Sequence, residues 1–193
     1  MANPNMKKKE SRISVKKKRW YSVLAPKILN NVVVGETPAA DPSMLVGRTF
    51  AVNLSSVMRN MRKQNVEVRF KIKEVKGNEC ITDFVSYEIL PAHVKRLVKR
   101  AKCRVDDSFV VETKDKLKVR VKPLILARDT TQKSVAGALR KTAKEMIIER
   151  IGKTDYSEFL NKVLVGEVQR DLKTRLRKIY PLSVAEIRAM KRL

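Results

Sequence analysis

The spacing of apolar residues changes along this chain, from every second position before residue 127 to helical spacing after residue 130. Within 66–72, for example, the apolar residues alternate with Glu67, Arg69 and Lys71. Period two is typical of a strand with one buried face and one solvent-exposed face. The pattern predicts strands over 48–54, 66–72, 80–90, 109–113 and 117–126, the last two forming a hairpin.

Helical spacing dominates the last third of the chain. A first amphipathic helix is expected after Thr130 or Thr131, either of which can cap it, with Leu139 and Ile147 on its apolar face. A shorter helix is expected between the strands, because Pro91 suits the first turn of a helix.

A second C-terminal amphipathic helix is expected from Asp155, where Glu158 completes a capping-box pattern. It should end before Pro181, and the residues that follow are expected to form a short extended tail. Near the other end, prolines and glycines punctuate 21–47, which predicts an extended segment that wraps the body.

Strands first and helices last indicate an α+β fold. We expect a β-barrel-like curved sheet with flanking helices. The 193 residues are ample for one buried core without disulfide or metal staples. We assign residues 1–19 to a basic N-terminal extension and residues 20–193 to a single domain.

Charge limits the partners of this domain. The chain has 44 Lys and Arg residues against 20 Asp and Glu, a formal net charge of +24. A compact domain with that excess repels itself unless a polyanion is bound, so nucleic acid is the first partner to consider.

The first nineteen residues are polar and basic, which predicts a leader that is disordered when free. It is either a solubilising tail or an arm that orders against phosphate, and its two lysine clusters favour the arm. At its end, Trp20 either anchors the leader to the core or stacks on a base. The anchor is the preferred interpretation, because Trp beside Tyr21 buries a large area.

No catalytic, metal or cofactor motif is evident. Cys80 and Cys103 form no CxxC pair and the single histidine is His93, so Cys and His alone cannot build a four-ligand zinc site. Acids occur singly or as Asp106-Asp107, and there is no glycine-rich phosphate loop. We therefore expect no enzyme activity, no cofactor and no metal. No stretch is long and apolar enough to span a bilayer, so a cytoplasmic protein is expected.

The positive charge is spread over a leader, exposed strand faces and exposed helix faces. A sequence-specific DNA reader concentrates charge around one recognition element. Distributed charge suits a protein embedded in folded RNA, recognised by shape and backbone. The candidate RNA-binding residues are Lys7, Lys8, Lys9, Lys16, Lys17, Lys18, Arg19, Trp20, Lys95, Arg96, Lys99, Arg100, Lys102, Arg120, Lys133, Arg140, Lys141, Lys144, Arg170, Lys173, Arg175, Arg177 and Lys178.

Several short segments, in this order and spacing, resemble one archaeal and eukaryotic ribosomal protein family. They are KKRWY at 17–21, VGET at 34–37, VKGN at 75–78, TKD at 113–115, VRVKP at 119–123 and IYPL at 179–182. Over roughly residues 16 to 190 the chain is similar to the small-subunit S3Ae (eS1) family, at a length typical of its archaeal members.

The resemblance implies a structural, non-enzymatic protein on the platform of the small ribosomal subunit, near the messenger exit. It implies a β-barrel-like body that binds ribosomal RNA and neighbouring ribosomal proteins, with messenger RNA near the exit as a further candidate partner. No homo-oligomer and no membrane partner are expected. Lys116 departs from the family pattern, which usually has Gly there, so the type of the hairpin turn stays open.

Two other functions remain as alternatives. One is a free-standing basic RNA- or DNA-binding protein, of the RNA-chaperone or chromatin type. The other is an RNA-processing enzyme, although no motif of the chain supports it.

Overall fold

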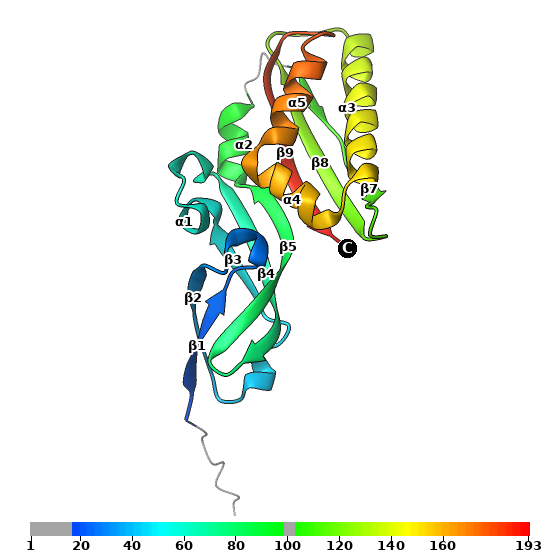
Figure 1. The fold of residues 1–193 in the computed structure, drawn as a ribbon. Coiled ribbons are helices and arrows are strands. Elements are labelled where there is room, and N and C mark those ends of the chain that lie inside the picture. The colour runs from blue at the N-terminus through cyan, green and yellow to red at the C-terminus, as the bar shows by residue number, and fades with distance from the viewer. Residues whose placement is uncertain (1–16, 99–102) are drawn as a thin grey trace, which may run out of the picture.

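The computed structural model describes residues 17–98 and 103–193, which form one mixed sheet with helices packed on it (Figure 1). Within these residues the sheet has nine strands: β1 (Arg19–Leu24), β2 (Val33–Ala39), β3 (Thr49–Asn53), β4 (Val66–Lys76), β5 (Glu79–Ile89), β6 (Arg104–Asp106), β7 (Phe109–Glu112), β8 (Lys118–Ala127) and β9 (Leu182–Arg192). The α-helices are α1 (Leu54–Met58), α2 (Pro91–Leu97), α3 (Lys133–Lys153), α4 (Tyr156–Val165) and α5 (Glu167–Leu176). Short 3-10 turns occupy η1 (Lys27–Leu29), η2 (Pro42–Leu45) and η3 (Met61–Lys63).

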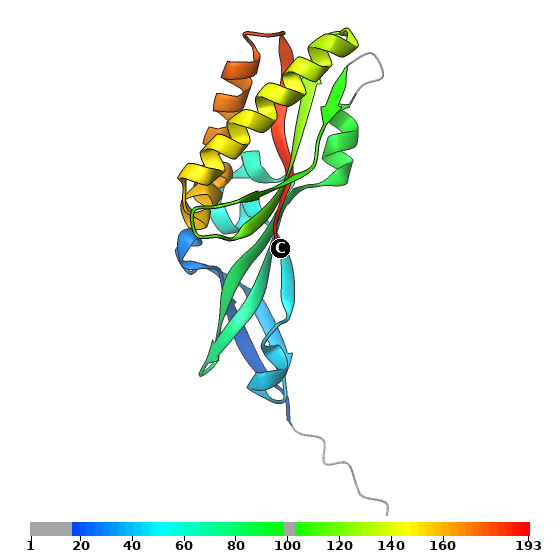
Figure 2. The ribbon, with the colours of Figure 1, turned by 90° about the vertical axis from the view of Figure 1, so that its right-hand side faces the viewer.

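Strand β5 joins the two halves of the sheet. Its first residues pair in parallel with β1, with Ser22 opposite Glu79, and its last residues pair antiparallel with β9, with Ser86 opposite Lys191. It also pairs antiparallel with β4 along its length. The molecule is therefore elongated, with β1 to β3 at one end and β6 to β9 with the three long helices at the other (Figures 1 and 2).

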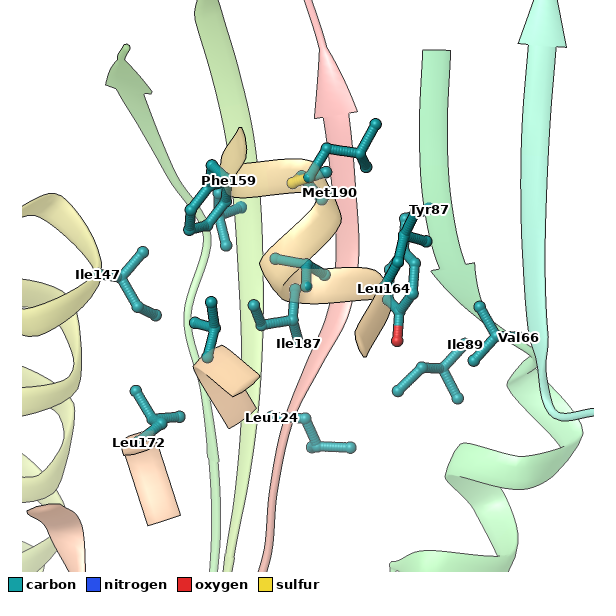
Figure 3. Packing of buried hydrophobic residues seen from close by; sticks show 14 of the residues in the cluster. Val66, Tyr87, Ile89, Leu124, Ile147, Phe159, Leu164, Leu172, Ile187 and Met190 are labelled. Carbon is teal, nitrogen blue, oxygen red and sulfur yellow. The ribbon is translucent and has the colours of Figure 1, made fainter. Parts of the chain in front are cut away.

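The main core lies between the β7–β8–β9 part of the sheet and helices α3, α4 and α5. Ile147 of α3, Phe159 of α4 and Leu172 of α5 point toward Ile187 and Met190 of β9 (Figure 3). All five side chains are buried. Burying a large aliphatic or aromatic side chain stabilises a fold by about 1.5–3 kcal/mol, so the amphipathic helices are held mainly by this layer.

A smaller core lies at the other end of the sheet. Tyr21 and Val23 of β1 pack with Leu45, Ile72 and Cys80. Burial raises the pKa of the Cys80 thiol, which keeps it protonated and unreactive.

The strands expected from period-two spacing are confirmed, including the β7–β8 hairpin. Its turn is closed by the Thr113 N–H, which donates to the Leu117 carbonyl at 3.0 Å, and by the Lys116 N–H, which donates to the Thr113 carbonyl at 2.9 Å. Lys116 has φ +59, a left-handed conformation that glycine adopts without steric penalty. The hairpin thus keeps a geometry suited to glycine although a lysine occupies the position.

The mixed α+β class is also confirmed, but the sheet is open. Its longest path runs β2-β1-β5-β9-β8-β6, and β2 and β6 at its two ends do not pair with each other. The expected barrel-like closure is therefore absent from the described part of the chain. The two ends diverge because β5 pairs with β1 near its beginning and with β9 near its end.

The sequence predicted two C-terminal helices, whereas the described residues form three, α3, α4 and α5. Gly166, at φ +88, ends α4 and precedes α5, so the second predicted helix is broken in its middle. The apolar residues keep their helical spacing across the break, from Val163 to Val168. The sequence pattern therefore gives no sign that the helix is interrupted. The first helix begins after Gln132, and neither Thr130 nor Thr131 caps it with a side-chain hydrogen bond.

The expected C-terminal tail is instead β9, an eleven-residue strand between β5 and β8. Register shifts in its pairing with β8 place buried residues at Leu182, Ala185, Ile187 and Met190, so period-two spacing is lost. The segment 21–47 is extended as predicted, but much of it forms the β1–β2 hairpin rather than an unpaired wrap.

Candidate nucleic-acid interface

The outer face of α3 presents one group of predicted cations. Lys133, Arg140, Lys141 and Lys144 are all exposed; Lys141 lies opposite the buried residues of the helix, and the other three lie between that side and the buried side. The Lys144 ammonium lies 5.9 Å from the centre of the Phe109 ring, which is within range of a cation–π contact. Lys144 therefore helps to fasten α3 to β7, while no ion pair within the described residues includes the other three.

A groove of about 490 Å³ separates α3 from α5. Across it, Arg150 pairs with Asp171, and Arg175 lies 3.8 Å from Glu149. A hydrogen bond and the charge of Lys153 lower the pKa of Glu149. Arg175 thus has an acidic neighbour, and part of its charge acts within the protein.

The end of α5 remains strongly basic. Arg177 and Lys178 are exposed, and no ion pair among the described residues includes either of them. Cations at a helix C-terminus complement its dipole. Because Lys178 lines the groove beside α3 together with Arg175, it extends the basic surface of α3 to the end of the neighbouring helix.

Helix α2 supplies two further predicted residues, both exposed. The Arg96 guanidinium donates to Asn65 Oδ1 at 3.1 Å, which fixes it against the loop before β4. Lys95 has no such contact within the described residues. Partial burial and the charge of Arg96 lower the pKa of His93, so this histidine is neutral near pH 7 and adds no positive charge.

The sheet face away from α3–α5 carries basic residues on neighbouring strands, and only some of them could be predicted from the sequence. Arg120 of β8 lies opposite Lys191 of β9, Lys191 opposite Ser86, and Ser86 opposite Arg69 of β4. These four residues line a groove of about 410 Å³. Only Arg120 was predicted.

Lys122 also lines this groove. The alternation of Lys118, Arg120 and Lys122 was the signal for the β8 part, whereas the contribution of β9 depends on strand pairing. Arg69 is partly neutralised by Glu67, whose carboxylate lies 3.1 Å from the arginine Nε.

At the N-terminal end, the neighbouring aromatic residues Trp20 and Tyr21 have opposite exposures. Tyr21 is 4% exposed and belongs to the smaller core, whereas Trp20 is 64% exposed. The preferred interpretation of Trp20 as an anchor is therefore wrong, because β1 alternates and places neighbouring side chains on opposite faces. Lys17, Lys18 and Arg19 are exposed beside it.

The structure thus groups the predicted residues of α3 and α5 on adjacent helices, and separates them from Arg120 and from the start of β1. Arg170 and Lys173 of α5 border a different groove, near η3. The remaining candidates, Lys7, Lys8, Lys9, Lys16, Lys99, Arg100 and Lys102, and the leader before Lys17 lie outside the described residues.

Metal-binding clusters and membrane-spanning helices are both absent from the described residues. Within residues 17–98 and 103–193, no group of three or more His, Cys, Asp or Glu residues could hold a metal ion. Within the same residues, no helix combines the length and apolar character needed to cross a membrane.

Comparison with known proteins identifies relatives over nearly the whole chain. A model of the Ribosomal S3Ae family matches residues 6–193. Proteins named small ribosomal subunit protein eS1 are similar to it. The one from Methanothrix thermoacetophila is 36% identical, over 90% of this chain and 82% of its own length, and that from Methanopyrus kandleri is 36% identical, over 90% and 84%. The Staphylothermus marinus protein is 32% identical, over 95% of this chain and 87% of its own.

Proposed function

Because this chain belongs to the Ribosomal S3Ae family and is a structural, non-enzymatic component of the small ribosomal subunit in the cytoplasm, we propose that it binds small-subunit ribosomal RNA through distributed Lys and Arg contacts. The observation that carries the proposal is the placement of exposed cations on separate faces. They occupy the outer face of α3 and the end of α5, the Arg120–Lys191 row of the sheet, and the start of β1.

Phosphates that approach from one direction could reach only one of these faces. Folded RNA offers phosphates from several directions, and each neutralised phosphate releases counterions. Arginine can also grip a phosphate with two parallel hydrogen bonds. The domain therefore suits a position between RNA segments, where its cores keep the shape and its surfaces neutralise charge.

The proposed location is the platform of the small subunit, near the messenger exit. This location follows from the family resemblance of the sequence. The proposed partners are small-subunit ribosomal RNA and adjacent ribosomal proteins, with messenger RNA near the exit as a further partner.

Sedimentation tests this proposal. The tagged chain, expressed in its own cells, should sediment with the small subunit at moderate salt and leave it progressively as salt increases. A chain that stays near the top of the gradient at moderate salt would overturn the proposal. If it remained there bound to mixed cellular RNA, the alternative of a free-standing RNA-binding protein would be favoured.

A further inference from the structure

A second basic groove, of about 560 Å³, lies where η3, the α4–α5 junction and β9 meet. It is separate from the surfaces of α3 and of the Arg120–Lys191 row. Arg62 and Lys63 border it from η3, and Arg170 and Lys173 border it from α5. Among the described residues of its lining, the one acid is Glu186 of β9.

Two cations of this groove are held by hydrogen bonds to backbone carbonyls. The Lys173 ammonium donates to the Ser183 carbonyl at 3.2 Å, and Arg170 Nε donates to the Gly166 carbonyl at 3.3 Å. Lys63 lies over the helix junction, its Nζ 3.2 Å from the place a Cβ of Gly166 would take. No ion pair within the described residues includes any of the four cations of the groove.

Glu186 is a single acid against these four cations. Burial raises the pKa of its carboxyl, against the opposing effect of Lys63 and Lys173. Four cations around one half-buried acid leave the groove net positive, which suits an anionic ligand.

A second observation on the groove is independent of its charge. The Gln169 side chain is 6% exposed, and its Nε2 donates to the Val163 carbonyl at 3.1 Å. Its Oε1 is buried and has no hydrogen-bond partner. An unpaired buried acceptor is unfavourable, so the site gains from a ligand that brings an N–H or O–H donor.

A nucleotide is an anion that also carries hydrogen-bond donors, in its ribose hydroxyls and base amines. We propose that this groove binds one nucleotide of the RNA, its phosphate held by the cations and a ribose hydroxyl or base amine donated to Gln169 Oε1. The volume lies within the usual range for small-ligand sites, about 300–1,000 Å³. Recognition of splayed-out nucleotides is a common mode for RNA. The inference rests on the proposed RNA-binding function and adds a specific contact to it.

Two variants and a matched control test the groove in the full chain. Lys63→Met removes one cation, Gln169→Met removes the acceptor at similar volume, and Lys73→Met removes an exposed lysine of β4 outside the groove. The affinity for transcribed small-subunit ribosomal RNA is measured by filter binding at several salt concentrations, and thermal melting checks folding.

We expect each groove variant to weaken RNA binding by about 3- to 10-fold, typical of one lost hydrogen bond or phosphate contact, and the control by less than about twofold. Lys63→Met should also make the salt dependence shallower, by about one counterion, whereas Gln169→Met should leave it unchanged. If Gln169→Met does not fold, the RNA affinity of Lys63→Met tests the groove by itself. The Lys63 side chain is not part of the core, so this variant should fold.

The same proteins are titrated with AMP, GMP, CMP and UMP to separate a nucleotide in RNA from a free one. Binding of a free nucleotide that the groove variants abolish, with unchanged RNA affinity, would overturn the RNA assignment in favour of a free-nucleotide site. Groove variants that bind RNA like the parent chain and bind no mononucleotide would overturn the inference altogether and leave the proposed function intact. A parent chain that does not bind the RNA would instead refute the proposed function itself.

Discussion

The Asp115 carboxylate accepts a hydrogen bond from the backbone N–H of Tyr156 at 2.9 Å. Asp115 lies in the turn between β7 and β8, and Tyr156 is the first residue of α4. The Lys114 ammonium, in the same turn, lies 3.9 Å from Asp155. The turn therefore caps a helix that begins 41 residues later, and it fixes the start of α4 against the sheet.

Removing this cap should destabilise the fold. We expect Asp115→Ala to lower the free energy of unfolding by about 1 kcal/mol, because an orphan N–H of α4 loses its acceptor. In a domain of this size that corresponds to roughly 2–4 °C in Tm. Asp155→Ala is the comparison variant, since it removes the ion pair with Lys114 of the same turn but no capping hydrogen bond, and it should cost less. Equal losses from the two variants, in urea titrations followed by circular dichroism, would contradict the assignment.

Two glycines should respond in opposite directions to alanine. Gly166 has φ +88, and a Cβ there would meet Lys63 Nζ at 3.2 Å, so Gly166→Ala should destabilise the fold by about 1–2 kcal/mol. Gly152 lies in α3 with open space around it, so Gly152→Ala should stabilise the fold by up to about 1 kcal/mol. Thermal melts of both variants test the break between α4 and α5. A neutral Gly166→Ala would argue for a continuous helix.

Glu186 should make stability depend on pH. Burial raises the pKa of this carboxyl in the folded state, so the folded chain binds more protons than the unfolded chain above the ordinary glutamate pKa, about 4.3. Its contribution to the unfolding free energy therefore falls as pH rises from about 4.3 through the raised pKa. Glu186→Gln should remove this slope, which urea titrations between pH 4 and 8 can measure. Parallel pH profiles for parent and variant would refute the raised pKa.

For comparison, Glu149→Gln is expected to change the pH profile in the opposite sense. The Lys153 hydrogen bond lowers the pKa of Glu149, so its stabilising effect is present above the ordinary glutamate pKa and lost as pH falls. Because Glu149 is exposed, this effect should be small.

Charge reversal on the outer face of α3 should weaken RNA binding in a salt-dependent way. We expect the double variant Arg140→Glu, Lys141→Glu to lose more affinity at 50 mM salt than at 200 mM, because screening and counterion release both reduce the phosphate contribution at higher salt. Both side chains are exposed and absent from the core, so melting should change little. An equal loss at both salt concentrations would indicate a packing role instead.

Local periodicity predicted the elements whose burial repeats regularly. The strand at 66–72 was visible because every second side chain enters the core, and the strand at 117–126 was visible because Val119 and Val121 are buried between cations at its start. The apolar face of α3 was visible from Leu139 to Ile147. Strand β9 was missed, because its register shifts disturb the alternation. The break at Gly166 was missed for the opposite reason, since the apolar spacing continues through it.

The candidate nucleic-acid interface was also predicted only in part from the sequence. Net charge and its spread along the chain predicted an RNA-binding protein, and exposed cations on α3 and at the end of α5 were named from the sequence. The partners of Arg120 across the sheet, Lys191 and Arg69, could not be found, because strand order decides which distant residues become neighbours.

The sequence by itself determined the alternating strands, the amphipathic helices, the excess of positive charge and the resemblance to a ribosomal family. These are properties of local spacing and composition, which each segment carries alone. Only the tertiary structure decided that the sheet stays open, that Asp115 caps α4, and that Arg62 and Lys63 lie beside Gln169. Such contacts join segments far apart in the chain, and they exist only once the shared core has fixed the segments against one another.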